Sequence, residues 1–438
     1  MDTTAAPEAF IPPVARTIAE TGLSAGLFEH LIFNILYSRG AMTGRALADV
    51  LGIGFEVIEP MMSDLKACHA VEVKGSEGFG LSSALFALSD MGRKRAREYF
   101  DINRYVGRAP VPLAQYRQAV ASQKLTKGWL TQESLAEAYR HVVIEPEVLE
   151  QIGPAANSGR SLLIYGMPGN GKTYMAEALL NLLSAEIYIP YAVEHNGTIT
   201  QIFDSLYHKR SVTDDFVECI ISKQRLYDGR WAKCQRPFLA SGGELGLDML
   251  ELRLNPVTRI YDAPLHVKAN NGIYLIDDFG RQRVSPVELL NRWIVPMESR
   301  IDHLDLASGG KLSMPFEIFL VFSTNLNPAD LGDEAFLRRI QYKMLVRNPS
   351  RTEFREIFRR QLSGLRLDCP DELLDKLLHE RYERESKPMR RCHPRDILLH
   401  ATDLIEFMGL PYALTEDLLN RAFDSCFVVS GETLDYLE

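Results

Sequence analysis

The sequence predicts an α/β fold whose core is a parallel sheet, with a smaller helical module before it and a run of helices after it. Ser161–Tyr165 is a short apolar run followed by a glycine-rich loop and a helical pattern, the order expected at the start of such a sheet. Strand and helix patterns then alternate to about residue 347 and include two apolar runs with polar ends, 273–278 and 319–325. From 350 to 430 the pattern is helical throughout and resembles a helical lid.

Length and composition restrict the class of protein. A chain of 438 residues is too long for one ordinary core, so we expect two or three domains. The apolar fraction of 46% and the charged fraction of 24% are typical of soluble globular proteins. No apolar run reaches the ~18 residues of a membrane span, and the acidic segment 1–8 lacks an apolar secretion signal. The net charge of −9 gives no global attraction to nucleic acid.

Cysteine usage indicates a reducing compartment. The cysteines lack the C-x-x-C spacing of zinc sites and are scattered. The six are Cys68, Cys219, Cys234, Cys369, Cys392 and Cys426. We therefore expect reduced thiols in a cytoplasmic protein.

Four segments are predicted along the chain. Residues 1–100 contain an apolar helical stripe with Ser24 as N-cap, a second helix closed by Gly52, a third from about Phe55 to His69, and a glycine-rich hairpin near 71–80. This order resembles a winged-helix module. Residues 101–160 form a connector, with the Pro154–Gly159 loop expected on the adenine side of a nucleotide. Residues 161–348 form the α/β core, and residues 349–438 form the lid.

The glycine-rich loop carries the most specific motif. Gly166–Thr173 reads GMPGNGKT and fits the phosphate-loop pattern G-x-x-x-x-G-K-[ST]. Its backbone N–H groups would wrap a triphosphate at a helix N-terminus, Lys172 would reach the β- and γ-phosphates, and Thr173 would hold Mg²⁺. The alternative is a glycine-rich turn that matches by chance. The predicted nucleotide-binding residues are Gly166, Pro168, Gly169, Asn170, Gly171, Lys172, Thr173 and Tyr174.

Two carboxylates end the next diagnostic strand. Asp277 and Asp278 follow the β-rich run that begins at Ile273. In a phosphate-loop protein Asp277 would belong to the Mg²⁺ shell and Asp278 would polarise the attacking water. Alone, an acidic pair after a strand is more often a helix cap or a solvated turn; the phosphate loop about 100 residues earlier favours the functional interpretation.

Further polar groups follow in order. Thr324 and Asn325 end a buried strand and could hold the lytic water. Arg338 and Arg339 follow, and one of them could act as an arginine finger on a neighbouring subunit; the alternative is a surface ion pair of little energetic value. Arg395 opens a lid helix and could touch the γ-phosphate.

These elements, in this order, resemble the AAA+ ATPase family over roughly residues 105–430. By that resemblance Lys172 and Thr173 are Walker A residues, Asp277 and Asp278 the Walker B pair, and Asn325 the first sensor. Arg338 or Arg339 would be the finger and Arg395 the second sensor. Most members carry Glu where this chain has Asp278, so the departure concerns turnover and not nucleotide binding.

A finer resemblance lies before the first-sensor strand. A helix is predicted at 288–298, and strands at 300–304 and 311–314 flank Ser308–Gly310 as a hairpin. Such a hairpin looks like the branch of MoxR-type chaperone ATPases and NtrC-type activators. The sigma-factor contact motif of the NtrC type is absent, which favours a MoxR-like or related remodelling ATPase.

Two regions leave alternatives open. The segment from Asp214 to Asn271, between the second strand and the Walker B strand, carries aromatic and glycine runs that could grip a substrate in a ring's pore or pack in a small core of their own. The third helix of the first module carries Glu56, Glu59 and Asp64 against Lys66, which disfavours DNA. The basic run at 93–97 could still contact a phosphate backbone.

The resulting functional prediction is an ATPase that hydrolyses Mg·ATP to remodel or assemble a protein partner as a ring oligomer, with a hexamer favoured. The alternative is a nucleotide-switched DNA-binding regulator acting through the winged-helix module, since that fold hosts both kinds of function.

Overall fold

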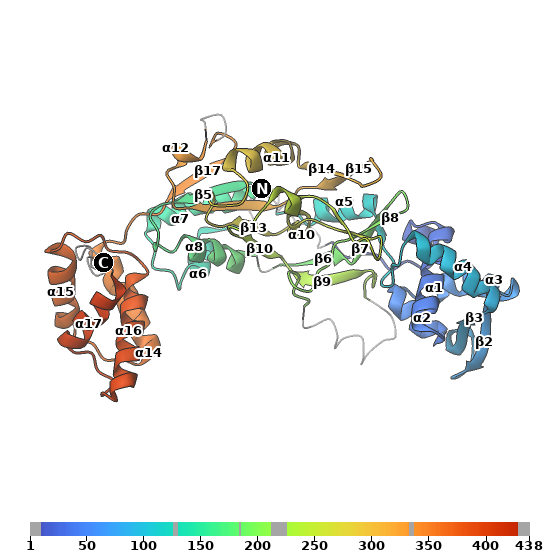
Figure 1. Ribbon diagram of the computed structural model, residues 1–438, viewed down its shortest axis with the longest axis horizontal. Coiled ribbons are helices and arrows are strands. Elements are labelled where there is room, and N and C mark those ends of the chain that lie inside the picture. Colours follow the sequence, from blue (N-terminus) through green and yellow to red (C-terminus); the bar gives the residue numbers. More distant parts are fainter. Residues whose placement is uncertain (1–9, 126–129, 184, 212–225, 333–336, 428–438) are drawn as a thin grey trace, which may run out of the picture. The chain divides into compact units, whose positions relative to one another are not determined.

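The computed structural model describes residues 10–125, 130–183, 185–211, 226–332 and 337–427 (Figure 1). The α-helices are α1 (Ala25–Arg39), α2 (Gly44–Leu51), α3 (Phe55–Ala67), α4 (Asp90–Ile102), α5 (Leu113–Ser122), α6 (Gln132–Ala138), α7 (Pro146–Ser158), α8 (Lys172–Ala178), α10 (Leu265–Lys268), α11 (Pro286–Ser299), α12 (Pro328–Leu331), α14 (Arg351–Leu365), α15 (Asp371–Leu377), α16 (His393–Met408) and α17 (Glu416–Cys426). The strands are β1 (Met42–Thr43), β2 (Val71–Ser76), β3 (Ala84–Leu88), β4 (Val111–Pro112), β5 (Ser161–Tyr165), β6 (Glu186–Pro190), β7 (Ala192–His195), β8 (Thr198–Gln201), β9 (Trp231–Gln235), β10 (Phe238–Ser241), β11 (Arg253–Leu254), β12 (Tyr261–Asp262), β13 (Ile273–Ile276), β14 (Ile301–Asp305), β15 (Lys311–Pro315), β16 (Phe319–Thr324) and β17 (Tyr342–Leu345).

The α/β class is confirmed by a five-stranded parallel sheet of order β10-β13-β16-β5-β17. Its two best-covered strands, β13 and β16, are buried at every residue. Uninterrupted apolar runs are what a sheet covered on both faces requires. The order places β16 between β13 and β5, so the polar ends of three predicted strands meet at one edge of the sheet.

One strand assignment was wrong. The predicted second strand, placed before Asp214, is not in the central sheet: β6 pairs with β9 in a separate two-stranded sheet. The strand beside β13 is β10, which lies within the segment interpreted as an insertion. The simple strand–helix alternation predicted for 161–347 therefore fails over residues 186–262, where β7, β8, β11 and β12 join β4 in a second five-stranded sheet.

A local signal for this second sheet was present in the sequence. β7 and β8 pair antiparallel around Asn196 and Gly197, and both residues have positive φ, 50° and 78°. An Asn-Gly pair between apolar runs is typical of a tight hairpin turn. A short apolar run does not indicate whether its strand pairs antiparallel or parallel. The prediction of parallel strands alternating with helices over residues 186–262 was wrong for this reason.

The chain divides into two compact units. The first comprises residues 1–126, 183–275 and 282–320, and the second comprises 127–182, 276–281 and 321–438, each considered over its described residues. This division does not follow the four predicted segments, because residues of the predicted core 161–348 fall in both units. The predicted boundaries stay a prediction.

In the first unit, α1 to α4 accompany a three-stranded sheet of order β1-β3-β2 (blue in Figure 1). Ser24 caps α1 by accepting from the Leu27 N–H, and Gly52 closes α2 in the left-handed conformation, as expected. The predicted hairpin of β2 and β3 is present. The winged-helix interpretation agrees with these elements and stays a prediction.

In the second unit, α14 to α17 form the predicted C-terminal group of helices (orange to red in Figure 1). Their shared core contains Phe354, Phe358, Leu398 and Phe423. The prediction of a loop at Pro154–Gly159 was wrong. Helix α7 continues through Pro154 to Ser158, and Gly159 is its left-handed C-cap. The loop that leads toward the phosphate-binding motif is therefore shorter than predicted.

Candidate functional site

The glycine-rich loop between β5 and α8 has the backbone conformation that its glycines allow. Gly166, Gly169 and Gly171 have φ of 149°, 79° and 78°, a region that side chains other than glycine rarely adopt. A Cβ at Gly166 would also collide with the Val346 carbonyl. The glycines of the motif are thus required by the path of the chain.

Lys172 lies at the beginning of α8 and is 7% exposed. Its Nζ donates to the carbonyls of Gly166 at 3.0 Å and Met167 at 3.1 Å, and to Asn325 Oδ1 at 2.5 Å. Burial lowers the pKa of the Lys172 ammonium, and Asp277 and Asp278 oppose that shift. The cation is therefore held among neutral oxygens that a triphosphate could replace.

The two predicted carboxylates lie beside the loop. Thr173 Oγ1 donates to Asp277 Oδ2 at 2.9 Å, and the Asp278 N–H donates to Asp277 Oδ1 at 3.0 Å. Asp278 is exposed and has a φ of 49°. Asn325 donates from Nδ2 to Asp278 Oδ1 at 3.0 Å. Asn325 therefore bridges Lys172 and Asp278.

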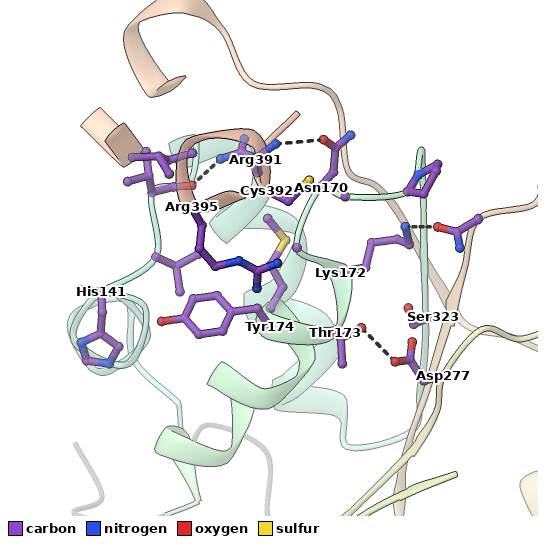
Figure 2. A pocket seen from close by; sticks show the side chains of 18 of the residues that line it. His141, Asn170, Lys172, Thr173, Tyr174, Asp277, Ser323, Arg391, Cys392 and Arg395 are labelled. Atoms are coloured by element: carbon purple, nitrogen blue, oxygen red, sulfur yellow. Dashed lines mark hydrogen bonds between the residues drawn. The ribbon is translucent and has the colours of Figure 1, made fainter. Parts of the chain in front are cut away.

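These side chains line a cavity of about 590 Å³ in the second unit. In Figure 2, Thr173 and Asp277 face each other across a hydrogen bond beside Lys172, and Arg395 extends towards Tyr174. Of the predicted nucleotide-binding residues, those from Pro168 to Tyr174 line the cavity, and Gly166 contacts Lys172 instead. The volume is within the roughly 300–1,000 Å³ of small-molecule sites.

Sequence reasoning missed several residues that line the cavity. They come from residues 141–143 (His141, Val142, Val143), from β16 (Ser323), from α14 (Ile357, Arg360, Gln361) and from the segment before α16 (Arg391, Cys392). No motif marks these positions. Two of them carried a usable signal: Arg391 is a cation in the same short run as the predicted Arg395, and Ser323 lies two residues before the predicted Asn325, on the same face of the strand.

Thr324 does not serve as predicted. Its side chain is fully buried, its hydroxyl donates to the Phe279 carbonyl at 2.6 Å, and it accepts from the Leu326 N–H. Successive residues of a strand face opposite sides of a sheet, so Ser323 lines the cavity in place of Thr324. A role for Thr324 in holding water is therefore excluded.

The predicted arginines lie in different settings. Arg395 lines the cavity, but its guanidinium donates to Asp396 at 2.8 and 3.0 Å and its side chain is 68% exposed. Arg338 and Arg339 are exposed and do not line this cavity. The preceding residues 333–336 lie outside the described part of the chain. The finger and second-sensor roles stay predictions.

The aromatic run of the insertion is packed. Trp231 is 4% exposed, and its ring meets Phe10 with centroids 5.9 Å apart. Arg230 and Asp228 form a buried ion pair at 2.7 Å. The second run ends in a fully buried Leu245. Residues 226–245 thus support the small-core alternative over a substrate-gripping loop; residues 214–225 lie outside the described part.

The site's donor set suits Mg²⁺. Thr173 and Asp277 offer a hydroxyl and a carboxylate oxygen within 2.9 Å of each other. Over the described residues there is no group of three His, Cys, Asp or Glu side chains that could hold a metal alone. Mg²⁺ commonly takes one or two protein oxygens and completes its shell with water and substrate phosphates, so these two residues fit the ion.

The sequence contains no apolar run long enough for a membrane span. Within the described ranges, none of the helices combines the length and apolar character needed to cross a bilayer.

The sequence was compared with family models, curated proteins and solved structures, and a family model matches only part of the chain. A model for a domain of unknown function (DUF8689) matches residues 350–425, the C-terminal helices. No curated protein matches the sequence.

Among solved structures, the RuvB Holliday junction branch migration motor of Thermotoga maritima is 14% identical, with a TM-score of 0.36 over 69% of this chain and 72% of RuvB. NtrX of Brucella abortus is 12% identical, with a TM-score of 0.40 over 76% of this chain and 60% of NtrX. A complex of the magnesium chelatase subunits BchI and BchD gives 17% identity and a TM-score of 0.31 over 68% and 94%. These are distant structural similarities, and at these values they carry no argument about the family or the activity of this chain.

Proposed function

We propose that this protein is an AAA+-type ATPase that binds and hydrolyses Mg·ATP. The observation that carries the proposal is the convergence of Lys172, Thr173, Asp277, Asp278 and Asn325 on one cavity of about 590 Å³. These residues come from three separate strand ends. A cation, a hydroxyl–carboxylate pair and a second carboxylate at one point match what phosphoryl transfer requires.

Each residue has a distinct task in this proposal. Lys172 would exchange its carbonyl and amide partners for the β- and γ-phosphates. Thr173 and Asp277 would hold Mg²⁺, which neutralises phosphate charge when bound. Asp278 would accept the proton of the attacking water. The Asn325 amide, which donates to Asp278, would position both the carboxylate and the water.

Asp278 is the departure from most members of the family, which carry Glu. Aspartate is one methylene shorter, so its carboxylate reaches less far into the cavity. Its φ of 49° is an uncommon conformation for a residue with a side chain. We propose that this backbone directs the shorter carboxylate and that the substitution affects turnover more than binding.

The proposed biological role is remodelling or assembly of a protein partner by a homo-oligomeric ring, with a hexamer favoured. Arg338 and Arg339 are exposed beyond the first-sensor strand, which suits a finger that acts on a neighbour's nucleotide. The hairpin of β14 and β15 supports the MoxR-like branch: its strands pair from Ile301 to Asp305 around Ser308–Gly310.

The alternative, a DNA-binding regulator, has weaker support. Glu56, Glu59 and Asp64 are all exposed on α3, the helix that would face DNA, and they would repel phosphate. On α4, Arg93, Lys94 and Arg97 are exposed, whereas Arg95 forms an ion pair with Glu29. Salt-dependent affinity of the full chain for duplex DNA would favour this alternative.

The deciding experiment measures Mg·ATP affinity and phosphate release for the full chain and for Lys172→Ala. We expect the wild type to bind and hydrolyse ATP, and the variant to do neither, because the triphosphate loses its buried cation. Circular dichroism should show that the variant stays folded. Wild-type activity in Lys172→Ala would contradict the assignment.

A further inference from the structure

A three-residue segment before α16 lies along the phosphate loop. The Cys392 N–H donates to the Gly169 carbonyl at 2.9 Å, and Arg390 Nη1 donates to the Pro168 carbonyl at 3.2 Å. The Arg391 N–H donates to Asn170 Oδ1 at 3.4 Å. A Cβ on Gly169 would lie 2.7 Å from the Cys392 sulfur. Residues 390–392 thus contact three consecutive residues of the loop.

The side chain of Arg391 makes two more connections. Nη1 donates to the Val143 carbonyl, and Nη2 donates to Glu353 Oε1. Val143 belongs to the connector that lines the cavity. Glu353 closes the capping box at the start of α14, because its Oε2 accepts from Ser350. One residue therefore joins the phosphate loop, the connector and the first lid helix.

This junction is buried and specific to the guanidinium group. The side chains of Arg391 and Glu353 are each 10% exposed. A planar fork with several N–H donors can serve a carbonyl and a carboxylate together, which a lysine ammonium does less well. Asn170, fully buried, extends the junction by donating to Asn348 Oδ1 at 2.8 Å.

We infer that Arg391 is a positioning residue that sets the spacing between the connector side and the phosphate side of the nucleotide cavity. This inference rests on the proposed nucleotide-binding function and adds a residue to it. A ligand that touches both sides, such as ATP, needs both held at the right separation. A ligand that occupies only the phosphate loop, such as inorganic tripolyphosphate, does not.

The competing explanation is direct contact between Arg391 and the phosphates. The Arg391 Nε is buried and has no hydrogen-bond partner among the described residues, so it is the guanidinium nitrogen that the protein leaves unsatisfied. The two explanations differ in their consequences. Direct contact makes ATP and tripolyphosphate equally dependent on Arg391, whereas positioning makes only ATP dependent on it.

The test compares the Mg²⁺-dependent binding of ATP and of inorganic tripolyphosphate to the full chain and to Arg391→Met, by calorimetry. Methionine keeps most of the buried hydrocarbon volume. We expect the ATP affinity to fall about tenfold or more, as for other coupled sites, while the tripolyphosphate affinity changes less than about threefold. Glu353→Gln, which removes the charge that holds Nη2, should show the same ATP-selective loss.

Arg384→Met is the matched control, because Arg384 is an exposed arginine that lies, like Arg391, between α15 and α16, and its replacement should leave both affinities unchanged. Equal loss of both ligands in Arg391→Met, or no loss of either, would overturn the inference. Thermal unfolding of each variant separates misfolding from mispositioning, and Glu353→Gln gives an independent reading if Arg391→Met does not fold. Failure of the proposed function itself would be distinct, because the wild-type chain would then bind neither ligand.

Discussion

Two clusters of charged side chains in this protein use similar residue types and differ in burial. In the second unit, Lys172, Asp277 and Asp278 line a cavity, and Asp278 is exposed. In the first unit, Asp302 accepts hydrogen bonds from His266 at 2.7 Å and from Arg292 at 2.8 and 3.1 Å. The side chains of His266 and Asp302 are 0% and 2% exposed.

The difference separates a site from a structural junction. Around Asp302 the charges neutralise one another and leave little surface for a ligand. They tie α10, α11 and β14 together at the base of the hairpin. Around Lys172, the hydrogen-bond partners are neutral oxygens and the side chain lines a cavity, so a phosphate could replace these partners. Perturbed charged groups mark function only where a cavity accompanies them.

The largest effect is expected for Asp302→Ala, which removes the buried carboxylate that accepts from His266 and Arg292 and leaves Glu251 as the remaining partner of Arg292. We expect the free energy of unfolding to fall by about 3–5 kcal/mol, measured by urea denaturation. Asp305→Ala is the control, because Asp305 lies on the same strand with its side chain 74% exposed and its ion pair should contribute less than about 1 kcal/mol. Equal stability of the two variants would show that the junction is not structural.

In contrast to Asp302→Ala, the variant Asp278→Asn should keep the stability of the wild type and lose ATP hydrolysis. We expect ATP to bind while turnover falls at least about 10²-fold, the scale for losing a general base. Phosphate release under saturating ATP measures the effect. Asp278→Glu tests the departure from the family by restoring the longer side chain. If Asp278→Asn hydrolysed ATP at the wild-type rate, another group would have to be the base.

Acid should lower the free energy of unfolding through the buried cluster around Asp302. Burial alone would raise the pKa of Asp302, but hydrogen bonds from His266 and Arg292 outweigh it and hold that pKa at about 2, below the ordinary value of 3.8. Because the folded pKa is the lower one, the stability is present above pH 4 and is lost as pH falls from about 4 to 2, by about 2 kcal/mol. Urea denaturation across this range measures it. Asp302→Asn should lose this component, and an unchanged acid profile in that variant would contradict the assignment.

Arg338 and Arg339 belong to neither cluster, and the smallest effect is expected from them. The double variant Arg338→Ala/Arg339→Ala keeps an intact site, and Lys172→Ala keeps an intact finger. If the finger acts across subunits, an equal mixture of these inactive proteins should regain about a quarter of wild-type ATPase activity, since random ring assembly pairs an intact site with an intact finger at one interface in four. Absence of rescue at every mixing ratio would contradict action in trans.

The sequence was sufficient where the signal is local. The strand from Ser161, the loop to Thr173 and the helix after it were predicted within a few residues, because glycine positions and apolar runs reflect backbone conformation directly. The capping of α1 by Ser24 and the hairpin of β14 and β15 are likewise local. The roles of the site residues, including the arginines, stay predictions.

Long-range pairing was decided only by the tertiary structure. Apolar runs of similar length did not reveal that β10, and not β6, lies beside β13, because strand partners are selected by packing between distant segments. The direction of Thr324 into the core and of Ser323 into the cavity depends on which face of β16 meets the loop. The junction at Arg391 joins segments that are more than 200 residues apart in the chain. The sequence by itself determined the chemistry available to this protein, and the tertiary structure decided which groups meet, since contacts between distant residues depend on the packing of the whole sheet and its helices.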